Sequence, residues 1–444
     1  MNEPATLQQW LEHIERQHPQ AIALGLERVE AVRRAMGLVP AFPVITVGGT
    51  NGKGSVCAML EAILYHAGYR VGCYTSPHLL RYNERVRVAR AEASDSDLAR
   101  AFAAVERARA GVPLTYFEYG TLAAVRLFAE QRVEVAVLEV GLGGRLDAVN
   151  AFDPDCAVVT TVDIDHVEYL GADREAIGYE KAGIFRAGRP AVCADSNPPQ
   201  RLVEHASRIG ARLLRIGADF GYRVQGSAQW QYWGPRGRRN ALPHPALRGA
   251  FQLANAAAAI TALECLRERL PIAMQDIRAG LLAAQVAGRF QVLPGRPPVI
   301  LDVAHNPQAA RALAANLADW GKGGRTLAVF AMLRDKDAAA VAAALAPQVD
   351  HWFVAGLPGP RGASAEELIA RLQAAGIGRV TGAADVAAAY AQACDMAAEN
   401  DRILVFGSFY TVAAVMQQRG LAAAAPARNE TGDDPRPRER RGGG

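Results

Sequence analysis

A glycine-rich loop that carries one lysine and ends in a serine follows an apolar, strand-like run at residues 44–48. The loop reads Gly49-Thr50-Asn51-Gly52-Lys53-Gly54-Ser55. Glycines allow several backbone N–H groups to point into one concavity, and the helix expected over 56–66 adds the positive end of its dipole. The lysine adds a full charge. We therefore predict a nucleotide-phosphate site, although the general P-loop pattern has the hydroxyl directly after the lysine. An ordinary glycine-rich turn is the alternative.

Polar side chains also follow three other apolar, strand-like runs. These are 69–74 before Ser76 and His78, 133–138 before Glu139, and 157–162 before Asp165-His166. Open α/β sheets bind ligands at the carboxyl ends of their strands, so we expect these groups at one edge, where they suit a divalent metal ion. A structural loop, a solvated acid and a hydrogen-bonded structural histidine are the respective alternatives. Burial of an unpaired carboxylate is costly, which favours the metal role for Glu139.

Helical patterns surround these strands. Apolar spacing indicates helices within 5–36, over about 95–110, and up to Gln131. The last of these follows an aromatic cluster that encloses one carboxylate, Thr115-Tyr116-Phe117-Glu118-Tyr119. Lys181 lies in a further helix-like stretch among apolar neighbours, for which an ordinary surface lysine is the alternative.

The second half of the chain predicts an appended element and another domain. Aromatic residues alternate within 219–247 around a Gly-Pro turn, which indicates a β-hairpin added to a first domain of residues 1–287. Glycine and proline then mark a linker at 288–298. Strand and helix patterns alternate over 299–421, with strands near 299–303, 327–331, 351–355 and 403–406, and predict a small Rossmann-like parallel sheet without a dinucleotide fingerprint. Residues 422–444 have no apolar periodicity, and we expect a disordered tail.

Length and composition restrict the classes of protein. The 444 residues are 50% hydrophobic and 21% charged, which is ordinary for two globular domains. The net charge of +4 is spread along the chain, so neither nucleic acid nor a membrane is an expected partner, and no apolar run approaches the roughly 20 residues of a membrane span. The six cysteines contain no Cys-x-x-Cys pair and indicate reduced thiols rather than zinc or a redox cofactor. We expect a cytoplasmic monomer.

Six motifs occur in one order along the chain: Gly49-Thr50-Asn51-Gly52-Lys53-Gly54-Ser55, Thr75-Ser76-Pro77-His78-Leu79, Tyr116-Phe117-Glu118, Glu139-Val140-Gly141-Leu142-Gly143-Gly144-Arg145-Leu146-Asp147, Asp165-His166 and Glu180-Lys181-Ala182-Gly183-Ile184. Together they resemble the bacterial bifunctional dihydrofolate synthase/folylpolyglutamate synthase family of the Mur ligase superfamily. Further matches run from about Leu24 to Tyr410.

The resemblance implies an α/β protein in which a P-loop-containing, Mur-ligase-like ATPase domain is followed by a smaller Rossmann-like domain. It implies an ATP-dependent amide ligase that adds L-glutamate to dihydropteroate and to reduced folates. The carboxylate substrate would be phosphorylated to an acyl phosphate, with ADP and phosphate released. ATP and two Mg²⁺ ions are the implied cofactors.

The resemblance also assigns residues to roles. Those for ATP are Thr50, Asn51, Gly52, Lys53, Gly54, Ser55, Val56, Asn255, Arg289, Asp302 and His305. Those for metal are Ser55, Ser76, Glu139 and His166. Those for the pterin or folate are Gly25, Leu26, Glu27, Arg28, Thr115, Tyr116, Phe117, Glu118, Leu146, Asp147 and Ala148. Catalytic roles would belong to Lys53, His166 and Lys181, the last as a carbamylated lysine. For Arg289 a solvated linker charge is the alternative.

Other functions would require different features of the sequence. A P-loop switch or kinase has no use for a second domain carrying Asp302 and His305. A peptidoglycan-type ligase should lack the Tyr-Phe-Glu and Arg-Leu-Asp segments. A non-catalytic folate-binding protein would not need every phosphate and metal ligand. A monofunctional folylpolyglutamate synthase, or another Mur-type amino-acid ligase, is the nearest alternative.

Overall fold

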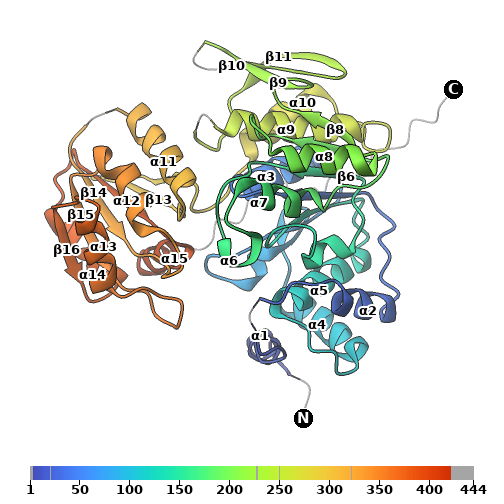
Figure 1. Ribbon diagram of the computed structural model, residues 1–444, viewed down its shortest axis with the longest axis horizontal. Coiled ribbons are helices and arrows are strands. Elements are labelled where there is room, and N and C mark those ends of the chain that lie inside the picture. The colour runs from blue at the N-terminus through green and yellow to red at the C-terminus, as the bar shows by residue number, and fades with distance from the viewer. Residues whose placement is uncertain (1–3, 21, 227–228, 250, 322, 422–444) are drawn as a thin grey trace.

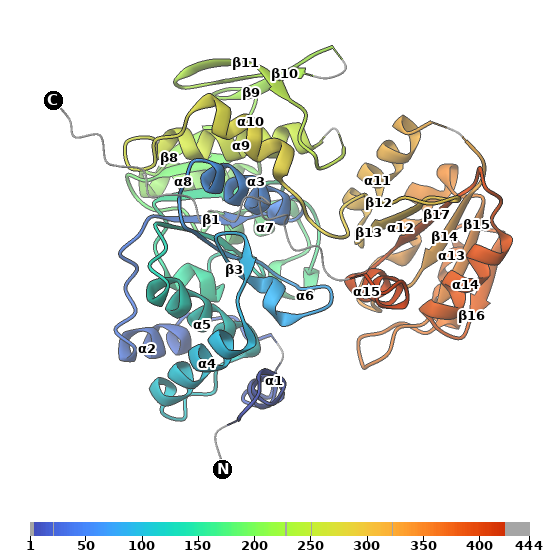
Figure 2. The same cartoon turned by 180° about the vertical axis from the view of Figure 1, so that it is seen from behind.

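Two mainly parallel β-sheets, each covered by helices, organise the computed structural model of the protein (Figure 1). The structure describes residues 4–20, 22–226, 229–249, 251–321 and 323–421. The predicted disordered tail at 422–444 lies outside these residues. Within them, no helix combines the length and the apolar character needed to cross a membrane. The view from behind shows that the helices within residues 7–283 (α1–α10) surround one sheet and those within residues 307–418 (α11–α15) surround the other (Figure 2).

The first sheet has eight strands in the order β4-β3-β2-β5-β1-β6-β7-β8. Their bounds are β1 Val44–Gly48, β2 Val71–Tyr74, β3 Val86–Val88, β4 Ala91–Glu92, β5 Val135–Glu139, β6 Cys156–Val159, β7 Pro190–Cys193 and β8 Arg212–Arg215. The six strands from β2 to β8 run parallel, and β3 and β4 close one edge in antiparallel pairing. The central strands therefore end at one edge of the sheet.

Helices bury both faces of this sheet, which explains why its strands read as continuous apolar runs. In β5, Val135 and Val137 pack against α3 (Lys53–His66), α9 (Phe251–Cys265) and α10 (Met274–Ala283). The alternate residues, Ala136 and Leu138, pack on the opposite face. That face is covered by α1 Leu7–Glu15, α2 Glu27–Ala35, α4 Asp95–Arg109 and α5 Tyr116–Glu130. A further cluster packs α7 (Arg174–Ala182) and α8 (Gln200–Ile209) against β7.

The segment predicted as a β-hairpin is a three-stranded antiparallel sheet. Its strands are β9 Gly221–Gln225, β10 Gln229–Gly234 and β11 Gly237–Pro243, in the order β11-β10-β9. Trp230 and Tyr232 on the middle strand are fully buried, and the Tyr232 hydroxyl lies 3.0 Å from Thr261 Oγ1 on α9. The prediction of β structure from the aromatic alternation is confirmed, but the sheet has one strand more than the predicted hairpin.

The second sheet contains six strands in the order β12-β13-β17-β14-β15-β16. Its elements are β12 Gln291–Leu293, β13 Val299–Asp302, α11 Pro307–Asp319, β14 Thr326–Phe330, α12 Ala338–Leu345, β15 His351–Ala355, α13 Ala365–Ala374, β16 Val380–Ala383, α14 Val386–Met396, β17 Arg402–Phe406 and α15 Phe409–Gln418. The predicted strands are present. The prediction of 288–298 as a plain linker is wrong in part, because β12 pairs antiparallel with β13.

Close packing of α10 on α3 generates a stability prediction. A Cβ atom at Gly280 would lie 2.5 Å from the Ile63 Cα and 2.6 Å from the Ile63 nitrogen, both backbone atoms of α3. We expect Gly280→Ala to lower the free energy of unfolding by about 2 kcal/mol, although alanine has the higher helix propensity. Gly378→Ala is the control, because nothing lies within 4 Å of its added Cβ. Urea unfolding of both variants checks this, and equal stabilities would contradict it.

Candidate active site

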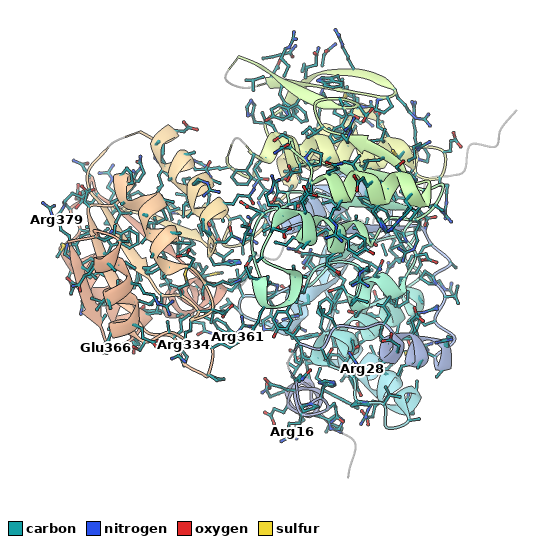
Figure 3. The ribbon with its side chains drawn as sticks, in the orientation of Figure 1. Arg16, Arg28, Arg334, Arg361, Glu366 and Arg379 are labelled. Carbon is teal, nitrogen blue, oxygen red and sulfur yellow. The ribbon has the colours of Figure 1, made fainter. Side chains whose placement is uncertain are left out.

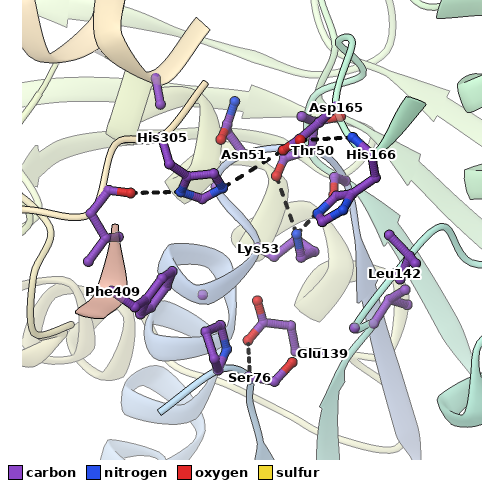
Figure 4. Close-up of a pocket in the computed structure, with 18 of the residues that line it drawn as sticks. Thr50, Asn51, Lys53, Ser76, Glu139, Leu142, Asp165, His166, His305 and Phe409 are labelled. Atoms are coloured by element: carbon purple, nitrogen blue, oxygen red, sulfur yellow. Dashed lines mark hydrogen bonds and ion pairs between the residues drawn. The ribbon is translucent and has the colours of Figure 1, made fainter. Parts of the chain in front are cut away.

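A cavity of about 620 Å³ lies between the two domains. The carboxyl ends of β1, β2, β5 and β6 open into it from the first domain, and the loops after β13, β14 and β17 from the second. Figure 4 shows Lys53, Asp165, His166 and His305 around one part of the cavity, with Ser76 and Glu139 beside them. Arg361 also lines the cavity and lies on the side of the second domain nearest the first (Figure 3).

Two glycines give the loop after β1 its shape. Gly49 has a φ of +142° and Gly52 a φ of +93°, conformations that side-chain-bearing residues rarely adopt. A Cβ at Gly49 would also collide with Thr160, and one at Gly52 would lie 2.8 Å from Asn255 Oδ1. The loop therefore requires glycine at both positions, and it delivers Lys53 to the first turn of α3.

Lys53 folds back over this loop. Its Nζ donates to the carbonyl oxygens of Gly49 at 3.0 Å and Thr50 at 3.3 Å. The Thr50 hydroxyl in turn donates to the Asp163 carbonyl at 3.0 Å, and the Thr50 N–H donates to the Thr161 carbonyl at 2.7 Å. The phosphate loop is thus tied to the loop that follows β6, which keeps the lysine charge at the edge of the sheet.

Ser55 lies in the first turn of α3, lines the cavity and is almost fully buried. Its hydroxyl accepts from Gln252 Nε2 at 3.3 Å, and Gln252 Oε1 accepts from Asn255 Nδ2 at 3.0 Å. The amides of α9 therefore fix the serine hydroxyl and border the phosphate loop.

Glu139 and Ser76 meet at the ends of β5 and β2. The buried Glu139 carboxylate accepts the Ser76 N–H at 3.1 Å through Oε2. Burial raises the pKa of Glu139, while the charge of Lys53 opposes that rise. No ion pair joins Glu139 to another residue in the part of the chain that the structure describes. A buried carboxylate beside a hydroxyl suits a hard divalent cation, so these residues fit the predicted metal.

His166 follows β6 in a left-handed conformation, with a φ of +50°. Burial lowers its pKa to about 4, so the imidazole is neutral at physiological pH and has a free lone pair for a metal. No group of three or more His, Cys, Asp or Glu side chains forms a metal cluster among the described residues. The predicted set contains only two such groups, Glu139 and His166, and its other members are hydroxyls.

Lys181 is buried at the cavity wall near the end of α7, only 3% exposed. Burial, reinforced by the charge of Lys53, lowers the pKa of its amine to about 7. Within the described residues, no hydrogen bond or ion pair satisfies this amine. The alternative of an ordinary surface lysine is therefore wrong.

The second domain contributes groups that are themselves tightly held. Asp302 accepts the Phe290 and Ala304 N–H groups, both at 2.8 Å. His305 Nδ1 lies 2.7 Å from the Val303 carbonyl, which leaves Nε2 facing the cavity. Arg289 lies over the Phe409 ring at 5.3 Å, and burial lowers its pKa. The alternative of a solvated linker charge at Arg289 is thus wrong.

Direct hydrogen bonds link the phosphate loop to the second domain. Asn51 Nδ2 donates to Asn306 Oδ1 at 3.1 Å and to Gln308 Oε1 at 2.5 Å. Lys336 Nζ donates to Asp165 Oδ1 at 2.5 Å. Gln308 and Lys336 are not among the residues predicted from the sequence. Lys336 follows β14 within Asp335-Lys336-Asp337, so charged residues after an apolar strand, the signal used for the first domain, would have found it.

The apolar end of the cavity includes Phe117, whose ring packs over Gly141. Glu118 at the start of α5 accepts from Thr115 N and Arg28 Nε, and its other oxygen lies 2.9 Å from Arg28 Nη2. Arg28 also donates to the Ala23 carbonyl at 2.7 Å. This ion pair therefore holds the segment before α2, which lines the cavity.

Most of the predicted site residues line this one cavity. They are Gly25, Thr50, Asn51, Gly52, Lys53, Gly54, Ser55, Ser76, Thr115, Phe117, Glu118, Glu139, Leu146, Asp147, Ala148, His166, Lys181, Asn255, Arg289, Asp302 and His305. Five predicted residues are not part of its lining, namely Leu26, Glu27, Arg28, Val56 and Tyr116. Tyr116 instead packs edge-on against Tyr82 under the Arg85 guanidinium.

Family models match both domains. Residues 47–263 match the Mur ligase middle domain, and residues 288–409 match the Mur ligase glutamate ligase domain. A P-loop ATPase domain that shares its cavity with a smaller α/β domain thus defines a Mur-type ligase.

Known relatives make the assignment more specific. The chain is 46% identical over 412 residues to dihydrofolate synthase/folylpolyglutamate synthase of Escherichia coli K12, covering 93% of this chain and 95% of the relative. It resembles the structure of E. coli FolC in complex with DHPP and ADP, with a TM-score of 0.90, 45% identity and coverage of 95% and 99%. A bifunctional enzyme with Mn, AMPPNP and L-glutamate bound gives a TM-score of 0.88 at 44% identity, with coverage of 95% and 100%. The chain belongs to the dihydrofolate synthase/folylpolyglutamate synthase family.

The Arg28 to Glu118 ion pair generates a second prediction. Arg28→Met strands a buried carboxylate, and we expect the free energy of unfolding to fall by about 2 kcal/mol. Adding Glu118→Gln removes the stranded charge and should recover part of the loss. Arg34→Met on the same helix breaks only an exposed pair with Glu30 and should change stability by less than about 0.5 kcal/mol. Urea unfolding measures all three, and equal stability of the single and double variants would count against this account.

Proposed function

We propose that this chain joins L-glutamate to the carboxylate of dihydropteroate and of reduced folates, with ATP cleaved to ADP and phosphate. One observation carries the proposal: the glycine loop and an aromatic-lined pocket open into the same cavity, which Glu139, His166 and Lys181 also line. Figure 4 shows Glu139 and His166 near Lys53. A phosphoryl donor and an acyl acceptor bound at the two ends would meet at these groups. The family assignment supports the same chemistry.

The phosphate end of the cavity would bind ATP. Backbone N–H groups of the loop and the start of α3 would hold the phosphates, while Lys53 and Arg289 offset charge on the group in transfer. Ser55, Ser76, Glu139 and His166 would hold Mg²⁺ directly or through water. The metal, when bound, supplies charge stabilisation at the phosphate oxygens. Asp302 and His305 would complete the nucleotide site from the second domain.

The apolar end would bind the pterin side of the substrate. Phe117 offers a ring for stacking on a planar heterocycle, and Asp147 offers acceptors for its N–H groups. Both Asp147 oxygens already accept N–H groups, from Val149 at 3.0 Å and Leu142 at 2.8 Å, but each oxygen can accept another. Arg28 and Leu26 would act indirectly, through the segment that they anchor.

Chemistry at this junction requires that water be excluded. The substrate carboxylate would attack the terminal phosphoryl group, and the glutamate amine would then attack the acyl carbon and displace phosphate. An acyl phosphate also reacts with water. Asn51 hydrogen-bonds to Asn306 and Gln308 of the second domain at the edge of the cavity, and these contacts would help to keep water from the intermediate.

The cysteines, the cavity and the charge distribution bear on location and assembly. All six cysteines are free thiols, of which Cys57, Cys73, Cys156 and Cys193 are buried. Such thiols suit a reducing compartment, and we infer that the chain works in the cytoplasm. One chain contributes both sides of the cavity, which supports action as a monomer, and the dispersed charge supports no role for nucleic acid.

A substrate panel tests the proposed function. We expect ADP release that depends on L-glutamate with dihydropteroate and with tetrahydrofolate, but not with a muramyl substrate. Lys53→Ala, which removes the loop charge without disturbing the core, should abolish turnover and controls for contaminating ATPases. Turnover with tetrahydrofolate but not with dihydropteroate would show a monofunctional folylpolyglutamate synthase. Turnover with neither would refute the proposal.

Carbamylation of Lys181 is a further prediction. A neutral amine reacts with CO₂ to give a carbamate and a proton, and a lysine whose pKa is about 7 is largely neutral above neutral pH. With ¹³C-bicarbonate we expect a carbamate carbon resonance that grows from pH 6 to pH 8 and is absent in Lys181→Ala. Acetate should partly restore turnover to that variant. An active wild-type protein without the resonance at pH 8 would rule out the modification.

A further inference from the structure

Asp165 lies at the boundary between the domains and contacts both. Its Oδ1 accepts the His166 backbone N–H at 2.8 Å and the Lys336 ammonium at 2.5 Å. Its Oδ2 accepts from Asn306 Nδ2 at 3.2 Å and lies 3.8 Å from His305 Nε2. One carboxylate of the first domain thus binds two side chains of the second, lies near a third, and accepts the backbone N–H of its neighbour, His166.

The ion pair at the centre of this cluster is shielded from water. The Lys336 side chain is 7% exposed and that of Asp165 is 10% exposed. Burial of either charge alone is unfavourable, so each needs the other. If the second domain moved away, both groups would regain water and the constraint on Asp165 would be lost.

The backbone conformation of His166 depends on its hydrogen bond to Asp165. His166 has a φ of +50° and is the residue before the short helix α6, Val167–Leu170. A non-glycine residue in this conformation costs of order 1–3 kcal/mol and persists only where its surroundings hold it. The hydrogen bond from the His166 N–H to Asp165 is one such restraint. Because this bond fixes the His166 peptide, it also fixes the direction in which the imidazole leaves the backbone.

We propose that Lys336 is a positioning residue, which by pairing with Asp165 holds His166 in the orientation that binds metal, so that the metal site is complete only when the second domain is docked. This inference rests on the metal role proposed for His166. It makes domain docking and metal binding mutually reinforcing, because whatever stabilises one stabilises the other. Lys336 itself does not bind the metal. The second domain completes the metal site indirectly, through Asp165.

The chain contains a matched control for this pair. Arg311 on α11 lies 3.5 Å from Asp163, two residues before Asp165, and also joins the two domains. Its side chain is 63% exposed, and the Asp163 carboxylate accepts the Ile164 N–H, whereas the His166 N–H is bound by Asp165. Exposed pairs contribute little. Arg311→Gln therefore removes an interdomain charge at the same place while leaving the support of His166 intact.

The first measurement is direct binding of Mn²⁺ by electron paramagnetic resonance, with a non-hydrolysable ATP analogue present. We expect Lys336→Met and the milder Lys336→Gln to weaken Mn²⁺ binding about tenfold or more, the usual effect of losing the support of a metal ligand. Lys336→Arg should recover most of the affinity, and Arg311→Gln should stay within about twofold of the wild type. Thermal melts identify any variant that fails to fold, and the remaining lysine variant then decides.

The second measurement needs neither metal nor turnover. Small-angle scattering of the ligand-free protein should show a larger radius of gyration for Lys336→Gln than for the wild type or Arg311→Gln. Kinetically, excess Mg²⁺ should restore much of the kcat of Lys336→Gln, because its defect lies in metal binding. Unchanged Mn²⁺ affinity in folded lysine variants, or an equal loss in Arg311→Gln, would overturn the inference. A wild-type protein that binds neither Mn²⁺ nor the nucleotide would instead refute the proposed function.

Discussion

Burial of charge between the two domains is the constraint on which the site depends. Glu139 and Lys181 are almost completely withdrawn from water, and neither has an ion-pair partner among the described residues. Burial moves the pKa of each toward its neutral form, upward for Glu139 and downward for Lys181. Packing of the surrounding core maintains this unfavourable arrangement. Ligands of complementary charge would pair with these groups. Binding would then offset the free-energy cost of burying them unpaired.

The register of the first sheet brings these groups together. Val47 of β1 pairs with Glu139 of β5, and Gly48 pairs with Val159 of β6. The glycine loop, the carboxylate and the loop to His166 therefore leave the sheet at the same level. Because both faces of these strands are buried, a shift of one residue would turn the apolar side chains of β5 to the wrong clusters. Core packing thus sets the relative positions of phosphate and metal groups.

Local signals in the sequence predicted what a single strand and its loop determine. The glycine loop, Glu139 and His166 each follow an apolar run, and parallel strands deliver them to one edge. Side-chain direction was harder to predict from the sequence. Tyr116 and Phe117 are adjacent aromatic residues at the start of α5, yet only Phe117 lines the cavity. The three residues of β12 are too few to show a period. The partnership of Lys336 with Asp165 depends on how two domains dock, which no local pattern records.

Docking also depends on the state of the phosphate loop. The Asn51 side chain bonds Gln308 of the second domain, and its backbone N–H donates to Thr161 Oγ1 at 3.2 Å. The same Thr161 hydroxyl lies 3.3 Å from Gln308 Oε1. The second domain therefore contacts a surface made jointly by the phosphate loop and the loop after β6. A loop displaced from its phosphate-binding conformation would misplace Asn51 and weaken that surface. Closure over the cavity is thereby favoured when the phosphate loop is correctly formed, which is the condition under which a water-sensitive acyl phosphate can be made.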